Sequence, residues 1–236
     1  MGQNEVRHVA IIMDGNRRWA LEKGLNTLDG HKAGADAVRK VVEACQELNI
    51  KYLTLYAFST ENWKRPLEEI EGLMFLLGRY IDLNIKKIDK EGIRLRAIGK
   101  IDEIPEKTRL KLTNAIEKTK NNKNGTLTLA ISYGGRSEII DATKKIVKDC
   151  LDTKINVSDI NESLFQKYLY APDIPDPDII IRTSGETRIS NFLLWQLSYS
   201  ELYFCDKYWP DFDKKDLEDC VRWFKTRERR FGLRNA

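Results

Sequence analysis

The sequence contains few cysteines and histidines, which limits the metal and redox chemistry to be expected. Its 236 residues include four cysteines, all far apart and without a Cys-x-x-Cys pair, and only two histidines. Widely spaced cysteines argue against a disulfide framework and against a zinc site. Two histidines argue against a His-rich metal centre. We therefore expect a reduced, cytoplasmic protein.

Long hydrophobic runs and a strong charge imbalance are also absent. No apolar run approaches the ~20 residues that cross a bilayer. The polar first residues lead directly into an aliphatic run, so we expect no signal peptide. The 40 basic and 36 acidic residues leave a net charge of only +4. Bulk charge therefore gives no reason to expect a nucleic-acid partner.

Strand-like and helix-like segments alternate along the chain. Short aliphatic runs predict strands, and apolar residues three and four apart predict helices. The predicted strands are 8–13, 52–58, 93–98, 127–133 and 178–181. The predicted helices are 17–23, 32–47, 67–88, 105–121, 137–151 and 213–230. This alternation predicts an α/β fold, one domain over residues 1–236, with a mainly parallel central sheet flanked by helices on both faces.

The junction after the first strand predicts an anion site with a metal ion. Asp14 ends the apolar run, and Gly15, Asn16, Arg17 and Arg18 follow at once. Backbone amides at a helix start bind anions, arginine can add a bidentate contact, and a carboxylate can share Mg²⁺ with a phosphate. The alternative is an Asx turn with solvated arginines. For this stretch alone the two interpretations are equally good.

Two more polar clusters directly follow predicted strands. They span residues 59–65 and 182–190. Ligands of such sheets bind outside the carboxyl ends of the strands. Each of the three clusters contains an arginine, whereas a lone arginine after a strand is usually a surface ion pair. Their convergence on one edge predicts a site for two pyrophosphate groups.

The helix at 67–88 is apolar over an unusually wide arc. One stripe contains Ile70, Leu73, Met74, Leu77 and Ile81, and it is widened by Leu67, Phe75 and Leu76. Most such helices are simply buried. The alternative is a helix that packs on the sheet and also lines an apolar cavity, which would suit a phosphate-headed ligand with a hydrocarbon tail.

Strand alternation gives one further expectation about that cavity. It places Leu53, Leu55 and Ala57 on one face of the second strand, with Thr54, Tyr56 and Phe58 on the other. We expect the small residue Ala57 to lie near the cavity wall. The alternative is that Ala57 is ordinary core.

Together, these motifs resemble the cis-prenyltransferases of the undecaprenyl diphosphate synthase family. The similar stretches follow in family order at residues 8–20, 30–34, 55–66, 133–136, 181–186, 189–196, 201–204, 209–212 and 227–232. An ordered set of this kind is far more specific than one short motif. Family members condense an allylic diphosphate such as farnesyl diphosphate with isopentenyl diphosphate, forming a cis double bond at each addition. The resemblance implies this activity, a hydrophobic tunnel, Mg²⁺, and undecaprenyl diphosphate as the product.

The resemblance also implies roles for individual residues. Asp14 matches the catalytic, magnesium-linked carboxylate, Asn62 a position often assigned to proton removal, and Glu201 a second metal-associated carboxylate. The implied contacts of the allylic diphosphate are Gly15, Asn16, Arg17, Arg18, Trp19 and His31. The implied flexible segment over the site contributes Ser59, Thr60, Glu61, Asn62, Trp63 and Arg65. The implied isopentenyl diphosphate contacts are Arg182, Arg188, Ile189 and Ser190.

Several of these roles have structural alternatives. A carboxamide is hardly basic, so positioning is the better role for Asn62, with pyrophosphate or Asp14 as the proton acceptor. His31 is either a phosphate donor or a helix cap. Trp19 and Trp63 are alternatively core aromatics. Glu201 is alternatively a carboxylate paired with an arginine.

The chain also departs from the family pattern. Many members have arginine at the position of Thr27 and histidine at that of Thr187, and these differences reduce the expected diphosphate and metal contacts. Arg17 is the nearest substitute for the missing arginine. Ile131-Ser132-Tyr133 replaces the more usual Ala-Asn-Tyr. None of these changes affects Asp14.

The resemblance further implies a homodimer, because the tail at Arg230, Phe231 and Gly232 resembles one that places Arg230 and Gly232 near the partner's active site. Membrane association would be at most peripheral, through the product. The alternatives are a short- or medium-chain cis-prenyl diphosphate synthase and a non-catalytic subunit. A non-catalytic subunit usually lacks the motif that is intact at residues 14–19. A nucleotide-binding protein would need a Gly-x-Gly-x-x-Gly or Gly-Lys-Ser loop, and neither is present.

Overall fold

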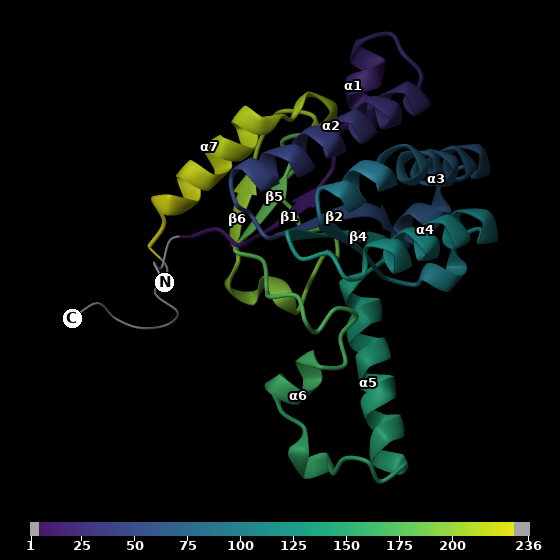
Figure 1. Cartoon of the computed structure of the whole chain (residues 1–236), viewed down its shortest axis with the longest axis vertical. Helices are drawn as coiled ribbons and strands as arrows, with labels where there is room; N and C mark the ends of the chain where they lie inside the picture. The colour runs from purple at the N-terminus through teal and green to yellow at the C-terminus, as the bar shows by residue number, and fades with distance from the viewer. Residues whose placement is uncertain (1–4, 229–236) are drawn as a thin grey trace.

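The computed structural model describes residues 5–228, in which strands and helices alternate as expected (Figure 1). The strands are β1 (His8–Ile12), β2 (Tyr52–Ser59), β3 (Ile93–Ile98), β4 (Gly125–Tyr133), β5 (Ile179–Arg182) and β6 (Glu201–Phe204). The α-helices are α1 (Asn16–Glu22), α2 (Thr27–Glu47), α3 (Leu67–Lys90), α4 (Glu106–Thr119), α5 (Gly135–Leu151), α6 (Glu162–Gln166) and α7 (Lys214–Lys225). A 3-10 helix, η1 (Thr60–Lys64), follows β2 directly.

The described strands form one six-stranded sheet in the order β3-β4-β2-β1-β5-β6, and every neighbouring pair is parallel. The α/β class and the parallel sheet are thus confirmed. β6 was not predicted because it is a four-residue edge strand whose Leu202 is exposed. Such a strand has neither the length nor the continuous apolar run that marks a buried strand.

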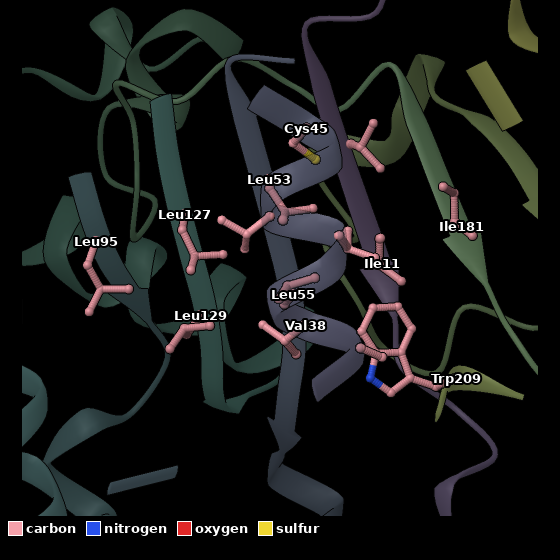
Figure 2. Close-up of a cluster of buried hydrophobic side chains, with 14 of the residues drawn as sticks. Ile11, Val38, Cys45, Leu53, Leu55, Leu95, Leu127, Leu129, Ile181 and Trp209 are labelled. Carbon is pink, nitrogen blue, oxygen red and sulfur yellow. The ribbon is translucent and has the colours of Figure 1, made fainter. Parts of the chain in front are cut away.

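Helices α2, α3, α4 and α7 pack on one face of the sheet around the larger core cluster. Figure 2 shows Val38 and Cys45 of α2 lying over Leu53 and Leu55 of β2. A smaller cluster covers the opposite face, where the chain after β5 contributes Phe192 and Leu193. From that face α5 leads away from the sheet towards α6 (Figure 1). Fully burying a leucine or isoleucine side chain contributes about 1.5–3 kcal/mol to stability, so the two core clusters stabilise the sheet from both faces.

A bulge near the end of β2 changes the expected alternation. Tyr56 is paired with Ala130 and Phe58 with Ile131, so Ala57 is an extra residue on the β2 side. Phe58 therefore joins the same core cluster as Leu53 and Leu55, and the expectation that it lies on the opposite face is wrong. A bulge re-aims the side chains around it, and this one lies next to the predicted site.

The helix boundaries differ from the predictions mainly at capping residues. The predicted helix 32–47 begins earlier, at Thr27, because the Asn26 side chain accepts a hydrogen bond from the Asp29 amide and caps it. The predicted helix 213–230 begins at Lys214 and ends earlier than predicted, at Lys225, followed by Thr226 as its C-cap. The expected tail residues Arg230, Phe231 and Gly232 lie outside the described part of the chain.

Helix α3 is less uniformly buried than its sequence indicated. Leu67 and Phe75, which widened the apolar stripe, are 69% and 65% exposed. Ile70, Met74 and Ile81 are buried against the core. In residues 5–228, no helix has both the length and the apolar composition needed to cross a membrane.

Candidate active site

A cavity of about 900 Å³ opens at the carboxyl ends of β1, β2 and β5. Its mouth is polar, and its interior lies between the sheet and helices α2 and α3. The apolar lining includes Val38, Leu55, Ala57, Leu73, Leu76, Leu77, Tyr80 and Leu129. One of the two expectations for α3 is thereby met, because this helix packs on the sheet and also lines a cavity.

Asp14 lies at the mouth of this cavity, immediately after β1. Its Oδ2 accepts a 2.7 Å hydrogen bond from Arg182, and its Oδ1 accepts one of 2.7 Å from the Gly15 amide. Burial alone would raise the pKa of Asp14. The hydrogen bond and charge of Arg182, together with the Gly15 amide, outweigh burial and hold that pKa below its ordinary value. The carboxylate is therefore ionised at neutral pH.

Arg182, the last residue of β5, joins Asp14 to the third polar cluster. Only 4% of this residue is exposed. One guanidinium nitrogen bonds Asp14, while the other donates to the Arg188 carbonyl at 2.5 Å and to Ser190 Oγ at 2.7 Å. A buried guanidinium with fixed donors supplies positive charge at a defined place, which suits phosphate oxygens.

Arg18 approaches the same region from α1. It donates to the Ser184 carbonyl at 3.2 Å and to Ser184 Oγ at 2.6 Å, and it lies 3.2 Å from a carboxylate oxygen of Glu186. Gly15 makes this turn possible with φ of 101°, and a Cβ there would lie 2.6 Å from the Tyr208 ring. The first and third clusters therefore meet, as the sequence predicted.

Three polar atoms at the cavity have no protein hydrogen-bond partner within residues 5–228. Asn16 Oδ1, His31 Nε2 and Arg182 Nε are buried there without a hydrogen-bond partner, and all three residues line the cavity. Burial, followed by the charge of Arg65, lowers the pKa of His31 to about 4, despite the Glu69 carboxylate 3.8 Å away. The imidazole is therefore neutral at pH 7. Unpaired buried polar atoms are costly, and a bound polar ligand would satisfy them.

The second cluster contributes both cavity contacts and supports. Ser59, Glu61, Asn62 and Arg65 line the cavity. Asn62 Oδ1 accepts a hydrogen bond from the Ser59 amide at 2.9 Å and caps η1. This capping bond favours positioning over proton removal as the role of Asn62.

Five sequence-predicted site residues do not line the cavity: Trp19, Thr60, Trp63, Ile189 and Glu201. Trp63 is a support, because its indole donates to Ser132 Oγ at 2.8 Å and its ring packs on Phe58. Lys23 lies over the Trp19 ring, at 4.8 Å from its centre. Neither tryptophan lines the cavity, and a direct substrate contact of either residue stays a prediction.

Glu201 lies far from Asp14 within the chain. It begins β6 beside Ile179, at the amino edge of the parallel sheet, and Arg227 lies 3.2 Å from its carboxylate. Asp14 follows the carboxyl end of β1. Within one chain the two carboxylates therefore do not face the same cavity, and the pairing of Glu201 with Arg227 is the structural alternative considered for this residue.

Other cavity residues were missed by the sequence analysis. Glu69, Tyr80 and Asn191 line the cavity without having been singled out. Glu69 was detectable as an acidic residue in the first turn of the predicted helix 67–88, four residues after Arg65, and the two pair at 2.9 Å. Tyr80 and Asn191 had no such signal, since their places depend on helix packing and on loop conformation.

The donor set around Asp14 fits a magnesium ion that a ligand completes. In residues 5–228, no group of three or more His, Cys, Asp or Glu side chains forms a protein-only metal site. Mg²⁺ is commonly held by one or two carboxylates together with substrate phosphates and waters. Asp14 is ionised, lies at the mouth of the cavity and retains free lone pairs, because a carboxylate has about four acceptor sites. It could therefore hold Mg²⁺ jointly with a diphosphate.

Comparison with known proteins agrees with this geometry. Residues 12–232 match the protein family described as "Putative undecaprenyl diphosphate synthase". A tritrans,polycis-undecaprenyl-diphosphate synthase (geranylgeranyl-diphosphate specific) of Pyrococcus abyssi is 50% identical, covering 96% of this chain and 86% of its own length. A ditrans,polycis-undecaprenyl-diphosphate synthase ((2E,6E)-farnesyl-diphosphate specific) of Micrococcus luteus is 45% identical, covering 96% and 91% respectively.

A solved structure is similar over nearly the whole chain. Lavandulyl diphosphate synthase from Lavandula x intermedia, in complex with dimethylallyl diphosphate, has a TM-score of 0.95 and 34% identity. The match covers 98% of this chain and 100% of that one. Fold, motif order and overall sequence thus agree, and the chain belongs to the undecaprenyl diphosphate synthase family of prenyl transferases.

Proposed function

We propose that this protein is a Mg²⁺-dependent cis-prenyltransferase that adds isopentenyl diphosphate units to an allylic diphosphate such as farnesyl diphosphate. We further propose that its product is undecaprenyl diphosphate. The observation that carries the proposal is one cavity with two chemically different ends. Its mouth offers arginines, unpaired polar atoms and an ionised carboxylate, while its interior is lined by aliphatic side chains. A diphosphate with a hydrocarbon chain has the same two parts.

In this proposal the residues at the mouth hold two diphosphates. Asn16, Arg18 and neutral His31 would contact the allylic diphosphate, while Arg182, Arg188 and Ser190 would contact isopentenyl diphosphate. Breaking the allylic carbon–oxygen bond places negative charge on the leaving pyrophosphate. Guanidinium groups and amides already fixed at that place stabilise this charge without reorganising, which is the largest catalytic effect available here.

Asp14 would hold the magnesium ion. When bound, Mg²⁺ neutralises charge on the diphosphate oxygens. The low pKa of Asp14 keeps its carboxylate ionised for this purpose. Asn62 would orient the bound substrate, since its oxygen already caps η1 and a carboxamide is a poor base. The proton released from the new adduct would pass to pyrophosphate or to Asp14.

The test is incubation of the purified protein with labelled isopentenyl diphosphate and, separately, dimethylallyl, farnesyl and geranylgeranyl diphosphates. Products are sized by chromatography, with and without exhaustive chelation. We expect chain growth from farnesyl diphosphate only when Mg²⁺ is present. Full activity after chelation would contradict the metal requirement, and absence of any condensation would contradict the proposed reaction.

Asp14→Ala should lower turnover by about a hundredfold or more, because it removes charge control beside the leaving group. Asp36→Asn is the matched control, since Asp36 is an exposed carboxylate on α2. Near-normal turnover of Asp14→Ala would contradict the role of Asp14.

The second candidate is a synthase with a shorter product. It is favoured by the similarity to lavandulyl diphosphate synthase, whose structure contains the five-carbon dimethylallyl diphosphate. The same assay separates the candidates. A product that stops after one or a few additions would identify the short- or medium-chain activity.

A further inference from the structure

The loop after β5 has an unusual backbone at three neighbouring residues. Ser190, Asn191 and Leu193 have φ of 46°, 64° and 44°, and none is glycine. The left-handed region is unfavourable for residues with side chains, although asparagine tolerates it best. Such a loop keeps its shape only when its surroundings hold it in place.

Asn191 makes the bonds that hold this loop. Its carbonyl accepts a 2.7 Å hydrogen bond from the Gly135 amide, and its Oδ1 accepts one of 2.9 Å from the Arg136 amide. These amides belong to the first residues of α5, where helix amides lack partners within the helix. Its Nδ2 then donates to Glu61 Oε1 at 2.9 Å. Asn191 therefore bonds α5 and η1 at the same time.

The Asn191 side chain packs closely against Gly134. A Cβ on Gly134 would lie 2.7 Å from Asn191 Nδ2 and also 2.7 Å from Thr60 Oγ1. Only glycine at this position allows η1 and the loop after β5 to approach so closely. The close contact between the second and third polar clusters is thus built into the fold.

The neighbouring residue, Ser190, connects Asn191 to the proposed diphosphate contacts. Ser190 Oγ accepts from Arg182, which also holds Asp14, and the Ser190 carbonyl accepts from the Tyr56 hydroxyl at 3.3 Å. Glu61 lines the cavity, as does Asn191 itself. A change in Asn191 would therefore shift the loop that contains Arg188 and Ser190 relative to η1.

We propose that Asn191 is a positioning residue that ties η1 to the loop after β5 and so fixes the isopentenyl diphosphate contacts Arg188 and Ser190 against the rest of the site. The proposal deepens the proposed function and rests on it for the identity of the substrate. The hydrogen-bond geometry itself is independent of the reaction.

The test exchanges the donor and the acceptor of the hydrogen bond between Asn191 and Glu61. Asn191→Asp keeps the acceptor for the Arg136 amide but places a second carboxylate against Glu61. Adding Glu61→Gln supplies an amide donor, so the double variant can re-form the bond in the opposite direction. Hydrogen bonds to charged groups are worth enough to change affinity by about tenfold.

We expect Asn191→Asp to raise the KM for isopentenyl diphosphate about tenfold, with the KM for the allylic diphosphate unchanged. The double variant should recover most of that loss, whereas Glu61→Gln alone should have a smaller effect. Asn114→Asp, at an exposed position of α4, is the matched control. A double variant no better than Asn191→Asp, or equal effects on both KM values, would overturn the proposal.

A second measurement keeps the inference separate from the proposed reaction. The thermal denaturation temperatures of wild type, both single variants and the double variant form a double-mutant cycle without any substrate. We expect the double variant to be more stable than Asn191→Asp. If wild type makes no product, the proposed function fails, but additive changes in this cycle are what would disprove the Asn191–Glu61 link.

Discussion

His8 shows at the residue scale how burial sets a charge state. It is the buried first residue of β1, with Nδ1 donating to the Pro175 carbonyl at 2.6 Å and Nε2 bonded to Thr54 Oγ1 at 2.8 Å. Burial lowers the pKa of His8 to about 4, against an ordinary value near 6.5, although the Pro175 carbonyl and Asp178 oppose the shift. The folded protein therefore contains a neutral imidazole well below pH 6.

A stability loss between pH 6.5 and 4 follows from this lowered pKa. In that window the unfolded chain binds a proton at His8 and the folded chain does not, so the free energy of unfolding falls as the pH falls. The loss is about 1.4 kcal/mol per pH unit, or roughly 3 kcal/mol by pH 4. Urea unfolding of wild type and His8→Gln at pH 7, 6 and 5 measures it. The stability difference between them should shrink towards pH 5, and a constant difference would contradict the argument.

Residue identity and residue role were predictable from the sequence to different degrees. Asp14 and Arg182 could be located because each follows or ends a recognisable strand, and strand ends converge in a parallel sheet; Arg18 lies in the helix start just after Asp14. The contact of Trp63 with Ser132 could not be predicted, because it depends on the direction of a side chain in a 3-10 helix. The capping bond of Asn62 could not be predicted for the same reason.

At the scale of elements, the bulge in β2 determines what the cavity wall looks like. It leaves Ala57 as the extra residue, partly buried against the core and lining the cavity with Leu55, Leu73 and Leu77. Simple alternation placed Ala57 correctly at the wall, but it placed Phe58 on the wrong face. A bulge has no reliable sequence signature, and this is why the strand could be predicted while its last residues could not.

Ala57→Leu should shorten the product while the first condensation persists. Each added methylene that enters the cavity contributes about 0.8 kcal/mol, so a side chain in the path penalises later additions more than the first. Ala97→Leu is the control, since Ala97 is also a partly buried strand residue packed on the same core but does not line the cavity. If Ala57 is ordinary core, overpacking costs ~1–3 kcal/mol and slows all steps alike. An unchanged product distribution at a lower rate would therefore remove Ala57 from the tunnel.

Tyr80 on α3 is a second residue whose position bears on product length. It lines the large cavity and also a small space of about 10 Å³, whose other walls include Arg39, Glu43 and Lys87. Glu43 pairs with Lys87 at 2.5 Å and with Arg39 at 3.2 Å, so this second space is bordered by charge. The Tyr80 ring therefore separates an apolar interior from an ion-paired surface between α2 and α3.

Tyr80→Ala should lengthen the product, because it joins the two spaces and removes the ring that separates them. Tyr80→Phe is the matched control, since it keeps the ring and should leave the product distribution unchanged. Chromatographic sizing of products from the same starter decides the matter. Products of wild-type length from Tyr80→Ala would show that the ring does not limit growth.

At the scale of the whole molecule, the sequence predicted the parallel sheet but not the position of every element around it. Alternating strands and helices were sufficient for a parallel sheet with its ligand site at the carboxyl ends. They could not reveal β6, which forms at the sheet edge only because Ile179–Arg182 of β5 offers it a partner. Nor could they show that α5 extends away from the sheet (Figure 1).

The projecting helix α5 presents apolar side chains to solvent. Ile140, Val147 and Leu151 are 54%, 52% and 79% exposed, and their spacing of seven and four places them on one face of the helix. Val157 and Ile160, shortly after the helix, are also exposed. Soluble monomers rarely leave many apolar side chains together on one surface, and such surfaces usually mark contacts with another chain.

We therefore predict that the protein is a homodimer joined through α5, because two-fold symmetric pairs are the commonest assemblies of identical chains. Light scattering should give about twice the chain mass of 27.4 kDa. Ile140→Asp with Val147→Asp should give the monomer mass, since each buried carboxylate would cost more than the apolar contact contributes. Leu83→Asp with Leu110→Asp is the matched control, because both leucines are exposed on α3 and α4, outside the α5 face.

If the partner's tail completes each site, mixing Arg230→Ala and Asp14→Ala chains should restore activity that neither has alone. A wild-type protein that is fully active at the monomer mass would refute both the dimer and the shared site.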